Sequence, residues 1–418
     1  MKLAWIINLY PPYIMGGNEI VAHDIVSELR ARGHQVYLLT GCGQKLKDPF
    51  HLTPVNFDLE RMEERFLGTR APALGESFRW HIFDQSTHKA TIQALRQIRP
   101  DLTIVDNFSL ISVAPLLAAV HAKSKVVVQA NDKWLIYGLK VPGQGLWHCP
   151  RWQRPPITAI QRLVQPIFSH TTRRVPIIVN SHFMKETFIR AGFEMDKLKV
   201  VHLGIDVNTF RPNTDRAQIG EPTRLVFGGA LWEGKGPQVA IRALAHLKNQ
   251  APQMRFVLSI YGEGKPEFKD YLSKLATEMG VNDLICYSGF VSPTELAEAF
   301  RTHDIFLFTS IWDEPFSLTL LSAMSCGIPV ISTSAGGSPE AIESGHTGLI
   351  VPPGDPVALA GAILELAQDP ALRHRLSTEA SAAVREKWSF EHYVDTLEAL
   401  YQAYSDESRS TQTGKERA

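Results

Sequence analysis

The residues around Glu314 carry the strongest chemical signal in this chain of 418 residues. An apolar strand ends shortly before Glu314, a helix is predicted to start near Ser317, and a second buried strand is predicted to begin at Pro329. A carboxylate then stands at the carboxyl end of a parallel strand, beside a helix N-terminus whose free N–H groups favour anions. Open α/β sheets bind ligands at that edge. A carboxylate can hold sugar hydroxyls while the helix end holds a phosphate, so the pattern indicates a nucleotide sugar. The alternative is a carboxylate that only caps the helix.

A lysine lies in a glycine-rich loop. Gly228 and Gly229 are followed by the run Glu233-Gly234-Lys235-Gly236, after the strand that is predicted to open the second half of the chain. The small neighbours allow Lys235 to reach a pyrophosphate. The loop is not a P-loop, because that motif needs Ser or Thr after the lysine and Gly236 stands there. The alternative is a solvated loop lysine.

A second pair of glycines, Gly16 and Gly17, follows the first predicted strand and opens a helix. Glycine at this position allows close approach of the backbone to a phosphate. The pair lacks the spacing of a G-x-G-x-x-G fingerprint, which argues against a dinucleotide cofactor. A tight strand-to-helix turn is the alternative interpretation.

Asn131 and Asp132 stand at the end of another predicted strand in the first half of the chain. Asp132 is a candidate acid or base, or a hydrogen-bond acceptor for the hydroxyl of an acceptor substrate. Capping of the loop explains the same residue equally well.

The segment from Lys133 to Lys185 contains no Asp or Glu. Its eight basic residues are Lys133, Lys140, Arg151, Arg154, Arg162, Arg173, Arg174 and Lys185. A helical apolar stripe within it comprises Ile157, Ile160, Leu163, Val164, Ile167 and Phe168. Basic residues, tryptophans and an amphipathic helix suit an anionic membrane surface or a lipid-phosphate acceptor. The alternative is a core helix with a loop that lines the acceptor site, and Pro166 would kink a helix lying flat on a bilayer.

Length and composition predict two domains and argue against a nucleic-acid-binding, secreted or membrane-spanning protein. A chain of this length exceeds one ordinary core, and 44% hydrophobic with 21% charged residues is typical of a globular protein. Zero formal net charge gives no field that would attract nucleic acid. The four cysteines form no C-x-x-C pair, which predicts reduced thiols in the cytoplasm and no metal site. The N-terminus is predicted to be a strand rather than a signal peptide, and no run of eighteen apolar residues predicts a membrane span.

Strands and helices alternate along both halves, which predicts parallel sheets covered on both faces. Helices are predicted over 18–32, 86–98, 109–122, 237–247 and 391–404, the first with Ile20, Val21, Ile25 and Leu29 inward. Strands are predicted over 3–8, 35–40, 102–105, 125–129, 176–179, 199–203, 224–227, 256–261, 284–288, 305–308 and 330–332.

Taken together, the motifs resemble those of the retaining glycosyltransferases of family 4, the group 1 glycosyltransferases, over nearly the whole chain. Beyond the glycine pair and the Lys235 and Glu314 regions, the matching residues include Arg32-Gly33-His34, Gly204-Ile205-Asp206, Phe210-Arg211-Pro212, Tyr261-Gly262-Glu263-Gly264, Gly289-Phe290-Val291, Pro339-Glu340 and Gly348. The resemblance implies the GT-B fold, with two facing Rossmann-like domains and a cleft between them. It places an acceptor-binding domain at 1–207, a hinge at 208–222, a donor-binding domain at 223–387, a closing helix at 388–404 and a disordered tail at 405–418.

The resemblance further implies sugar transfer from a nucleotide-sugar donor, with retention at the anomeric carbon and with neither metal nor cofactor. The chain contains no D-x-D, which agrees with metal-free binding of the phosphates. Carried over by position, Glu314 holds the donor sugar and Lys235 pairs with the phosphates. Asp132 stays a catalytic candidate because of its place at a predicted strand end. The remaining donor contacts fall on Gly16, Gly17, Gly229, Gly262, Phe290, Phe316, Ser317 and Leu318.

The sequence departs from the family pattern at three positions. Ser322 stands where a second glutamate would hold the ribose, and a hydroxyl holds it more weakly than a carboxylate. Ala230 replaces an arginine that helps to neutralise the phosphates, a role left open for Arg173 or Arg174. Asn131 replaces a histidine and cannot titrate.

These departures keep a second function open, a protein that binds nucleotide sugars or glycans with weakened or lost turnover. A third possibility on the same fold is a phosphorylase or a sugar-nucleotide epimerase. The expected partners are the donor, a glycan or lipid-linked acceptor and an anionic membrane at its inner face, with no nucleic acid. Neither the base, the sugar nor the acceptor follows from the sequence.

Overall fold

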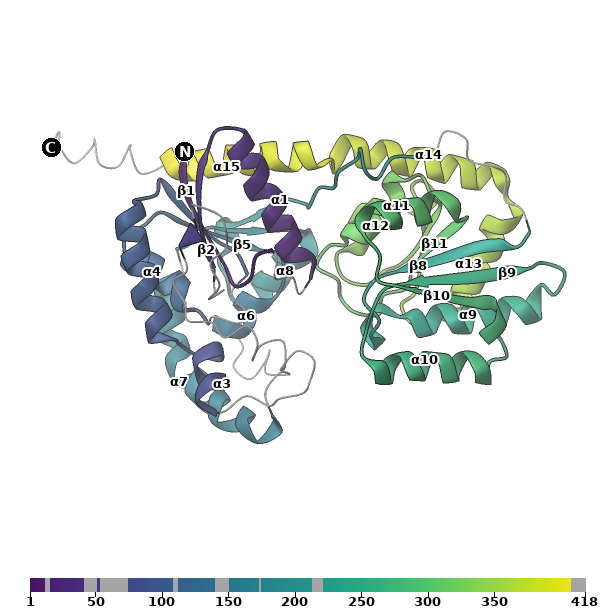
Figure 1. Ribbon diagram of the computed structural model, residues 1–418, viewed down its shortest axis with the longest axis horizontal. Helices are drawn as coiled ribbons and strands as arrows, with labels where there is room; N and C mark the ends of the chain where they lie inside the picture. The colour runs from purple at the N-terminus through teal and green to yellow at the C-terminus, as the bar shows by residue number, and fades with distance from the viewer. Residues whose placement is uncertain are drawn as a thin grey trace. The chain divides into compact units, whose positions relative to one another are not determined.

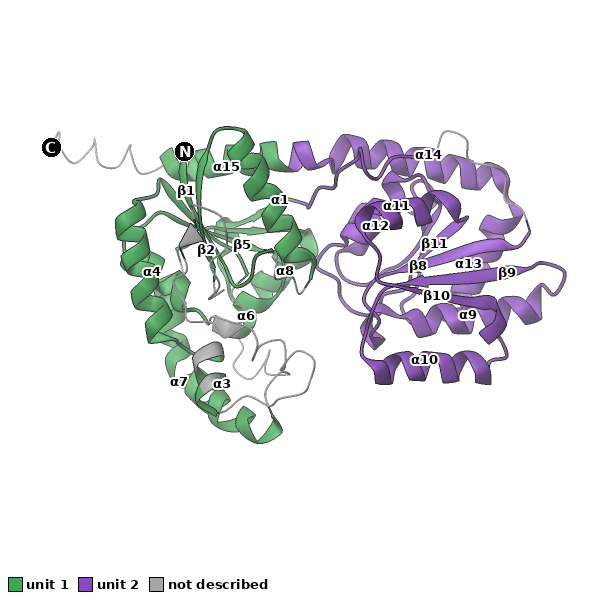
Figure 2. Cartoon of the chain, in the orientation of Figure 1, with its two compact units in different colours: residues 1–201, 394–418 green, residues 202–393 purple. Residues whose placement is uncertain are grey.

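The structure is a computed structural model that describes residues 1–11, 16–40, 51–52, 74–107, 112–139, 150–172, 174–212 and 221–406 (Figure 1). The chain forms two compact units, one of Met1–Val201 with Val394–Ala418 and the other of His202–Tyr393 (Figure 2). Residues 213–220 of the predicted hinge, residues 407–418 of the predicted tail and Arg173 lie outside the described residues.

A parallel sheet forms the centre of the first unit. Over the described residues its strand order is β3-β2-β1-β4-β5-β6-β7. These strands are β1 (Lys2–Ile7), β2 (Gln35–Thr40), β3 (His51–Leu52), β4 (Leu102–Val105), β5 (Val126–Ala130), β6 (Ile177–Val179) and β7 (Leu198–Val200). Because β1 pairs with both β2 and β4, the strand order reverses at β1, which is the kind of position where open α/β sheets bind ligands.

Helices cover both faces of this sheet. They are α1 (Gly17–Ala31), α3 (Leu74–His81), α4 (Gln85–Ile98), α5 (Ala114–His121), α6 (Trp134–Leu139), α7 (Arg154–Thr172), α8 (His182–Arg190) and the end of α15 (Phe390–Asp406). Side chains alternate along β1: Ala4 and Ile6 join a core with residues of α4 and α5, whereas Trp5 contacts Tyr401 of α15. The two faces of the sheet therefore bury apolar residues against different helices.

The second unit repeats this plan around a sheet of order β10-β9-β8-β11-β12-β13, with the reversal between β8 and β11. Its strands are β8 (Thr223–Gly228), β9 (Phe256–Tyr261), β10 (Ile285–Gly289), β11 (Ile305–Phe308), β12 (Val330–Thr333) and β13 (Leu349–Val351). Its helices are α9 (Pro237–Gln250), α10 (Pro266–Glu278), α11 (Pro293–Thr302), α12 (Leu318–Ser325), α13 (Pro356–Gln368) and α14 (Pro370–Lys387).

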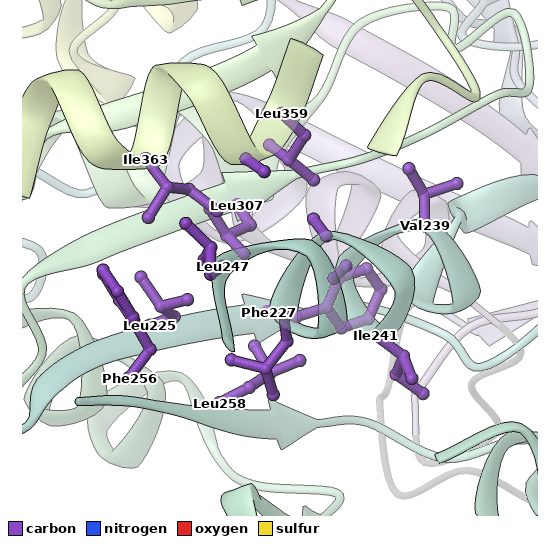
Figure 3. Close-up of a cluster of buried hydrophobic side chains, with 14 of the residues drawn as sticks. Leu225, Phe227, Val239, Ile241, Leu247, Phe256, Leu258, Leu307, Leu359 and Ile363 are labelled. Atoms are coloured by element: carbon purple, nitrogen blue, oxygen red, sulfur yellow. The ribbon is translucent and has the colours of Figure 1, made fainter. Parts of the chain in front are cut away.

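Two helical layers enclose the second sheet. Helix α9 contacts α10 and α13, and α12 contacts α11 and α14. Figure 3 shows the core beneath α9 and α13, where Phe227 of β8, Leu258 of β9 and Leu307 of β11 meet Leu247 and Ile363 from the helices. Strands that are buried on both faces read as continuous apolar runs, which is why the sequence located them closely.

One helix prediction was wrong in detail. Ile20 was expected to point inward from α1, but 40% of its surface is exposed. Val21, Ile25 and Leu29 are buried as predicted. These three recur every four residues, and Ile20 lies about 100° around the helix from Val21, beyond the buried stripe.

The C-terminal half of α15 is attached to the first unit by polar contacts. The Tyr401 hydroxyl donates to Gln129 Oε1 at 2.5 Å. Arg32 donates to Glu398 Oε2 at 2.8 Å, and His34 Nε2 lies 2.7 Å from Glu398 Oε1. The family-like Arg32-Gly33-His34 motif therefore holds the last helix, a role that its sequence did not reveal.

We expect Glu398→Gln to destabilise the first unit by about 1 kcal/mol, since it removes the charge that two side chains contact. Hydrogen bonds from Arg32 and His34 hold the pKa of Glu398 below its usual range. The stabilisation is therefore present above the carboxyl's unfolded pKa and is lost as the pH falls through the lower folded pKa. Thermal unfolding at neutral and acidic pH measures it, with the exposed Glu391→Gln on the same helix as control. Equal unfolding temperatures for both variants would show that Glu398 contributes nothing.

Candidate functional site

Lys235 and Glu314 form an ion pair in the second unit. Lys235 ends a 3-10 turn, η4 (Glu233–Lys235), after β8, and Glu314 lies in the loop after β11. These two strands are neighbours, and the strand order reverses between them. The structure thus brings the two predicted residues together at the point where open α/β sheets bind ligands.

The pair is unequally buried. The Glu314 side chain is 9% exposed and that of Lys235 is 26% exposed. Glu314 Oε1 also accepts a hydrogen bond from the Ser310 hydroxyl at 3.1 Å. Burial of a carboxylate is costly unless it is paired, and the ammonium and hydroxyl groups offset that cost. The lysine keeps a solvent-facing side from which it can reach an anion.

Thr309, at the end of β11, holds the loop that carries Lys235. Gly236 has φ 73°, and a Cβ there would lie 1.9 Å from the Thr309 carbonyl oxygen. The Thr309 hydroxyl donates to the carbonyl of Gly236 at 2.9 Å. Only glycine allows this approach, so Gly236 is required by contact within the chain.

A third loop, after β12, supports the backbone of Glu314. Gly336 has φ 62°, and a Cβ there would lie 2.3 Å from the Glu314 carbonyl oxygen. The N–H of Gly337 donates to that same oxygen at 2.7 Å. Three loops from adjacent strands therefore hold the carboxylate.

Helix α12 starts directly beyond Glu314. Ser317 is its N-cap, and the Ser317 hydroxyl accepts from the N–H of Leu320 at 3.3 Å. Phe316 is buried, with its ring 4.9 Å from that of His202, and Leu318 is the first helical residue. The predicted phosphate-capping residues therefore stand at a helix N-terminus beside the ion pair. Ser322 lies further along α12 and is 5% exposed.

The loops after β8, β9 and β10 lie against one another. Gly262 has φ 142°, and a Cβ there would lie 1.8 Å from the carbonyl oxygen of Gly229. The N–H of Gly262 donates to the carbonyl of Gly289 at 2.7 Å. Phe290 follows, and 79% of its surface is exposed. An exposed ring can stack on a base, so the predicted base contacts have a chemically suitable surface. Ala230, which directly follows Gly229, is exposed.

Gly16 and Gly17 open α1 in the first unit. The N–H of Gly16 donates to Glu19 Oε2 at 2.9 Å, so the Glu19 side chain satisfies the N-cap N–H of α1. A Cβ at Gly17 would meet no atom within 4 Å, so nothing described in the chain requires glycine there. The prediction of a phosphate contact at this turn stays a prediction.

Asp132 belongs to a group of carboxylates that the sequence did not connect. The pKa of Asp132 is raised to about 7 by burial and by the charge of Glu19, against a hydrogen bond from the N–H of Trp134. The pKa of Asp106, which follows β4, is also raised to about 7 by burial and by the charges of Glu19 and Asp132, against hydrogen bonds from Asn18 and the N–H of Asn107. Asp106 is fully buried, and its Oδ2 has no hydrogen-bond partner among the described residues.

Three asparagines join this group. The Asn18 amide donates to Asp106 Oδ1 at 3.2 Å, and its oxygen accepts from the Asn131 amide at 2.8 Å. Asn180 donates to the Asn131 carbonyl at 3.0 Å. Asn131 thus acts as a hydrogen-bonding residue in a polar network at the start of α1 and the carboxyl ends of β4, β5 and β6.

Sequence reasoning missed Thr309, Ser310, Asn18 and Asp106. Each stands within two residues of a strand or helix end, but small polar residues are common there. Their partners lie far along the chain, so no local pattern distinguishes them. Within each unit by itself, the described residues hold no three His, Cys, Asp or Glu side chains close enough to share one metal ion.

Two family models match the chain. The model described as Glycosyltransferase Family 4 matches residues 15–209, and the one described as Glycosyl transferases group 1 matches residues 213–383. Among curated proteins, the D-inositol 3-phosphate glycosyltransferase of Streptomyces scabiei is 30% identical over 71% of this chain and 64% of the relative. The protein of the same name from Streptomyces bingchenggensis is 32% identical over 49% of this chain and 48% of the relative. The chain spans about half the length of the first relatives it matches, between 43% and 51%.

Solved structures show the same fold. HepE from Anabaena, in complex with UDP and glucose, has a TM-score of 0.70 and 17% identity, covering 96% of this chain and 100% of that chain. Sucrose-phosphate synthase from Thermosynechococcus elongatus has a TM-score of 0.72 and 19% identity, covering 96% and 98%. The prediction of two Rossmann-like units of the GT-B class is confirmed.

Among the described helices, none combines the length and apolar character needed to cross a bilayer.

We expect Asp106→Asn to flatten the pH dependence of stability. The Asp106 carboxyl has a folded pKa of about 7, against about 3.9 in an unfolded chain. Between these values the folded state binds a proton that the unfolded state lacks, so the free energy of unfolding falls as the pH rises from about 4 to about 7. Asparagine mimics the neutral acid and removes this slope. Urea unfolding at several pH values measures it, with the exposed Asp196→Asn as control. An unchanged slope in Asp106→Asn would contradict the buried proton.

Proposed function

Because the chain belongs to the group 1 glycosyltransferases of family 4, we propose that it transfers a sugar from a nucleotide-sugar donor to a hydroxyl of a glycan or lipid-linked acceptor. The observation that carries the proposal is the ion pair of Lys235 and Glu314 beside the N-terminus of α12. An ammonium and a helix end suit a diphosphate, and a buried carboxylate suits sugar hydroxyls.

In the proposed reaction, the acceptor oxygen bonds to the anomeric carbon as the bond from that carbon to the diphosphate oxygen breaks. The acceptor proton passes to the departing diphosphate on the same face of the sugar, which retains the anomeric configuration. Lys235 and the start of α12 stabilise the negative charge that develops on the diphosphate. These groups supply positive charge without a metal, so we propose metal-independent transfer.

Glu314 has a positioning role in this scheme. Its carboxylate is held by Ser310 and Lys235, and its backbone is held by Gly337. A side chain fixed in this way orients the sugar hydroxyls without losing conformational entropy on binding. When a diphosphate binds, it competes for Lys235, which frees carboxylate lone pairs for the sugar.

We expect Lys235→Ala and Glu314→Ala each to reduce kcat/KM at least about a hundredfold, equivalent to about 2.7 kcal/mol in the transition state. The exposed pair of Arg190 and Glu186, whose atoms are 2.9 Å apart, provides control variants that should retain activity. Glu314→Gln separates charge from hydrogen bonding, since it keeps the shape of the side chain. Near-normal rates in both alanine variants would refute the site.

The donor is best identified by thermal shift against UDP-, GDP- and ADP-sugars. A donor at a hundred times its dissociation constant should stabilise the protein by about 2.7 kcal/mol. UDP is a natural first choice because HepE was crystallised with it, and inositol 3-phosphate belongs in the acceptor panel because the curated relatives carry it in their name. The Lys235→Ala variant should lose the shift that the wild type shows.

A binding protein with lost turnover is the second candidate, favoured by one observation. Asn131 stands where the family has a histidine, and its amide is engaged by Asn18. Donor binding by calorimetry, combined with neither transfer nor slow donor hydrolysis, would decide for this candidate.

A further inference from the structure

Helix α7 presents an apolar face to solvent. Leu163 is 76% exposed and Ile167 is 65% exposed. In η2 (Arg151–Gln153), just ahead of the helix, Trp152 is 66% exposed. A spacing of three and four residues places the other exposed residues of the helix on this same side. We call this set the α7 apolar face: Trp152, Pro155, Pro156, Ala159, Leu163, Pro166 and Ile167.

The opposite side of α7 packs against the core of the first unit. Ile157 is 1% exposed and packs with Ile82, and Ile160 and Val164 are packed against that pair. The sequence placed Leu163 and Ile167 in one helical apolar stripe with Ile157, and the structure exposes the first two while it buries Ile157. A folded unit gains nothing from two aliphatic side chains in water, and exposed apolar patches of this kind mark interaction surfaces.

Charge identifies the chemistry of the partner. Arg162 lies at the edge of the α7 apolar face, and Arg151 and Arg174 flank the helix, all three exposed. Residues 133–185 contain no Asp or Glu, so no acidic residue of this segment neutralises them. An apolar strip bordered by arginines complements an anionic, partly apolar surface, which is the character of a membrane rich in acidic lipids.

We propose that the α7 apolar face docks on the surface of a membrane that contains anionic lipids. Leu163, Ile167 and Trp152 enter the interface between headgroups and acyl chains, and the arginines contact lipid phosphates. The predicted kink is not a break, because α7 continues through Pro166 as one helix. Pro166 is itself exposed, so water can reach the carbonyl that the missing N–H leaves without a donor.

A second copy of the chain is a weaker candidate for the same face. In a two-fold interface the same patch meets itself, so the arginine borders of the two copies would approach each other. Like charges in contact oppose such an interface, whereas acidic lipids favour binding. The docking is independent of sugar transfer and needs no donor.

Flotation with phosphatidylcholine vesicles, with and without phosphatidylglycerol, tests the proposal on the full chain. We expect binding only to the anionic vesicles, weakened by high salt because the attraction is screened. The double variant Leu163→Ser/Ile167→Ser should lower the partition coefficient at least about tenfold. Arg162→Gln should reduce binding and also its salt dependence.

Met195→Ser is the matched control, since Met195 is 66% exposed in the same unit and outside α7. Circular dichroism and the unfolding temperature establish that each variant is folded, and every site is exposed. The proposal is overturned if the wild type does not bind vesicles, or if it binds neutral and anionic vesicles equally. It is also overturned if the α7 variants bind as strongly as the wild type. A concentration-dependent dimer, seen by sedimentation, that the double variant abolishes overturns it as well. Flotation is measured without donor, so loss of binding and loss of transfer remain distinguishable.

Discussion

The reversal of strand order within each parallel sheet is the constraint on which the candidate chemistry depends. Neighbouring strands such as β8 and β11 are separated by about eighty residues of chain, yet their carboxyl ends lie side by side. Loops that leave such a pair turn toward opposite layers of helices. The space between them can hold a ligand while each loop remains part of a rigid unit. A lysine and a carboxylate from distant segments thereby face the same point.

The close approach of these loops depends on residues without side chains. At Gly236 and Gly336 the backbone of one loop lies against the backbone of the next, closer than any Cβ would allow. The hydroxyls of Thr309 and Ser310 then add hydrogen bonds to the carbonyls of Gly236 and Gly234, which also accept from backbone N–H groups. Gly236 and Gly336 are therefore needed for the packing of the loops, whether or not a ligand binds beside them. Preorganisation of this kind is what an electrostatic site requires, since its dipoles need not reorganise when charge develops.

The sequence predicted the strands well and the polar network poorly, for a physical reason. A buried parallel strand such as β11 is a continuous apolar run, and its predicted limits agree with the structure. The motifs also placed Lys235 and Glu314 around one donor molecule, and in the structure the two side chains form an ion pair. In contrast, Asp106 and Asn18 are 88 residues apart, and their hydrogen bond depends on the order of strands, which local periodicity does not encode. Whether the stripe with Leu163 faces outward or into the core stayed open, because a periodic apolar pattern does not say how wide the buried stripe is.

The return of α15 to the first unit has a consequence for biosynthesis. Trp5 and Gln129 obtain Tyr401 as a neighbour, and Arg32 obtains Glu398, only from the last helix. When residues 1–201 have left the ribosome, the apolar strip that α15 covers is still exposed. The whole of His202–Tyr393 must be synthesised before the covering residues of α15 appear. At about 5–20 residues per second the delay is on the order of ten to forty seconds. During that interval the apolar residues that α15 covers stay exposed to water, and truncation just before Val394 would leave them so permanently.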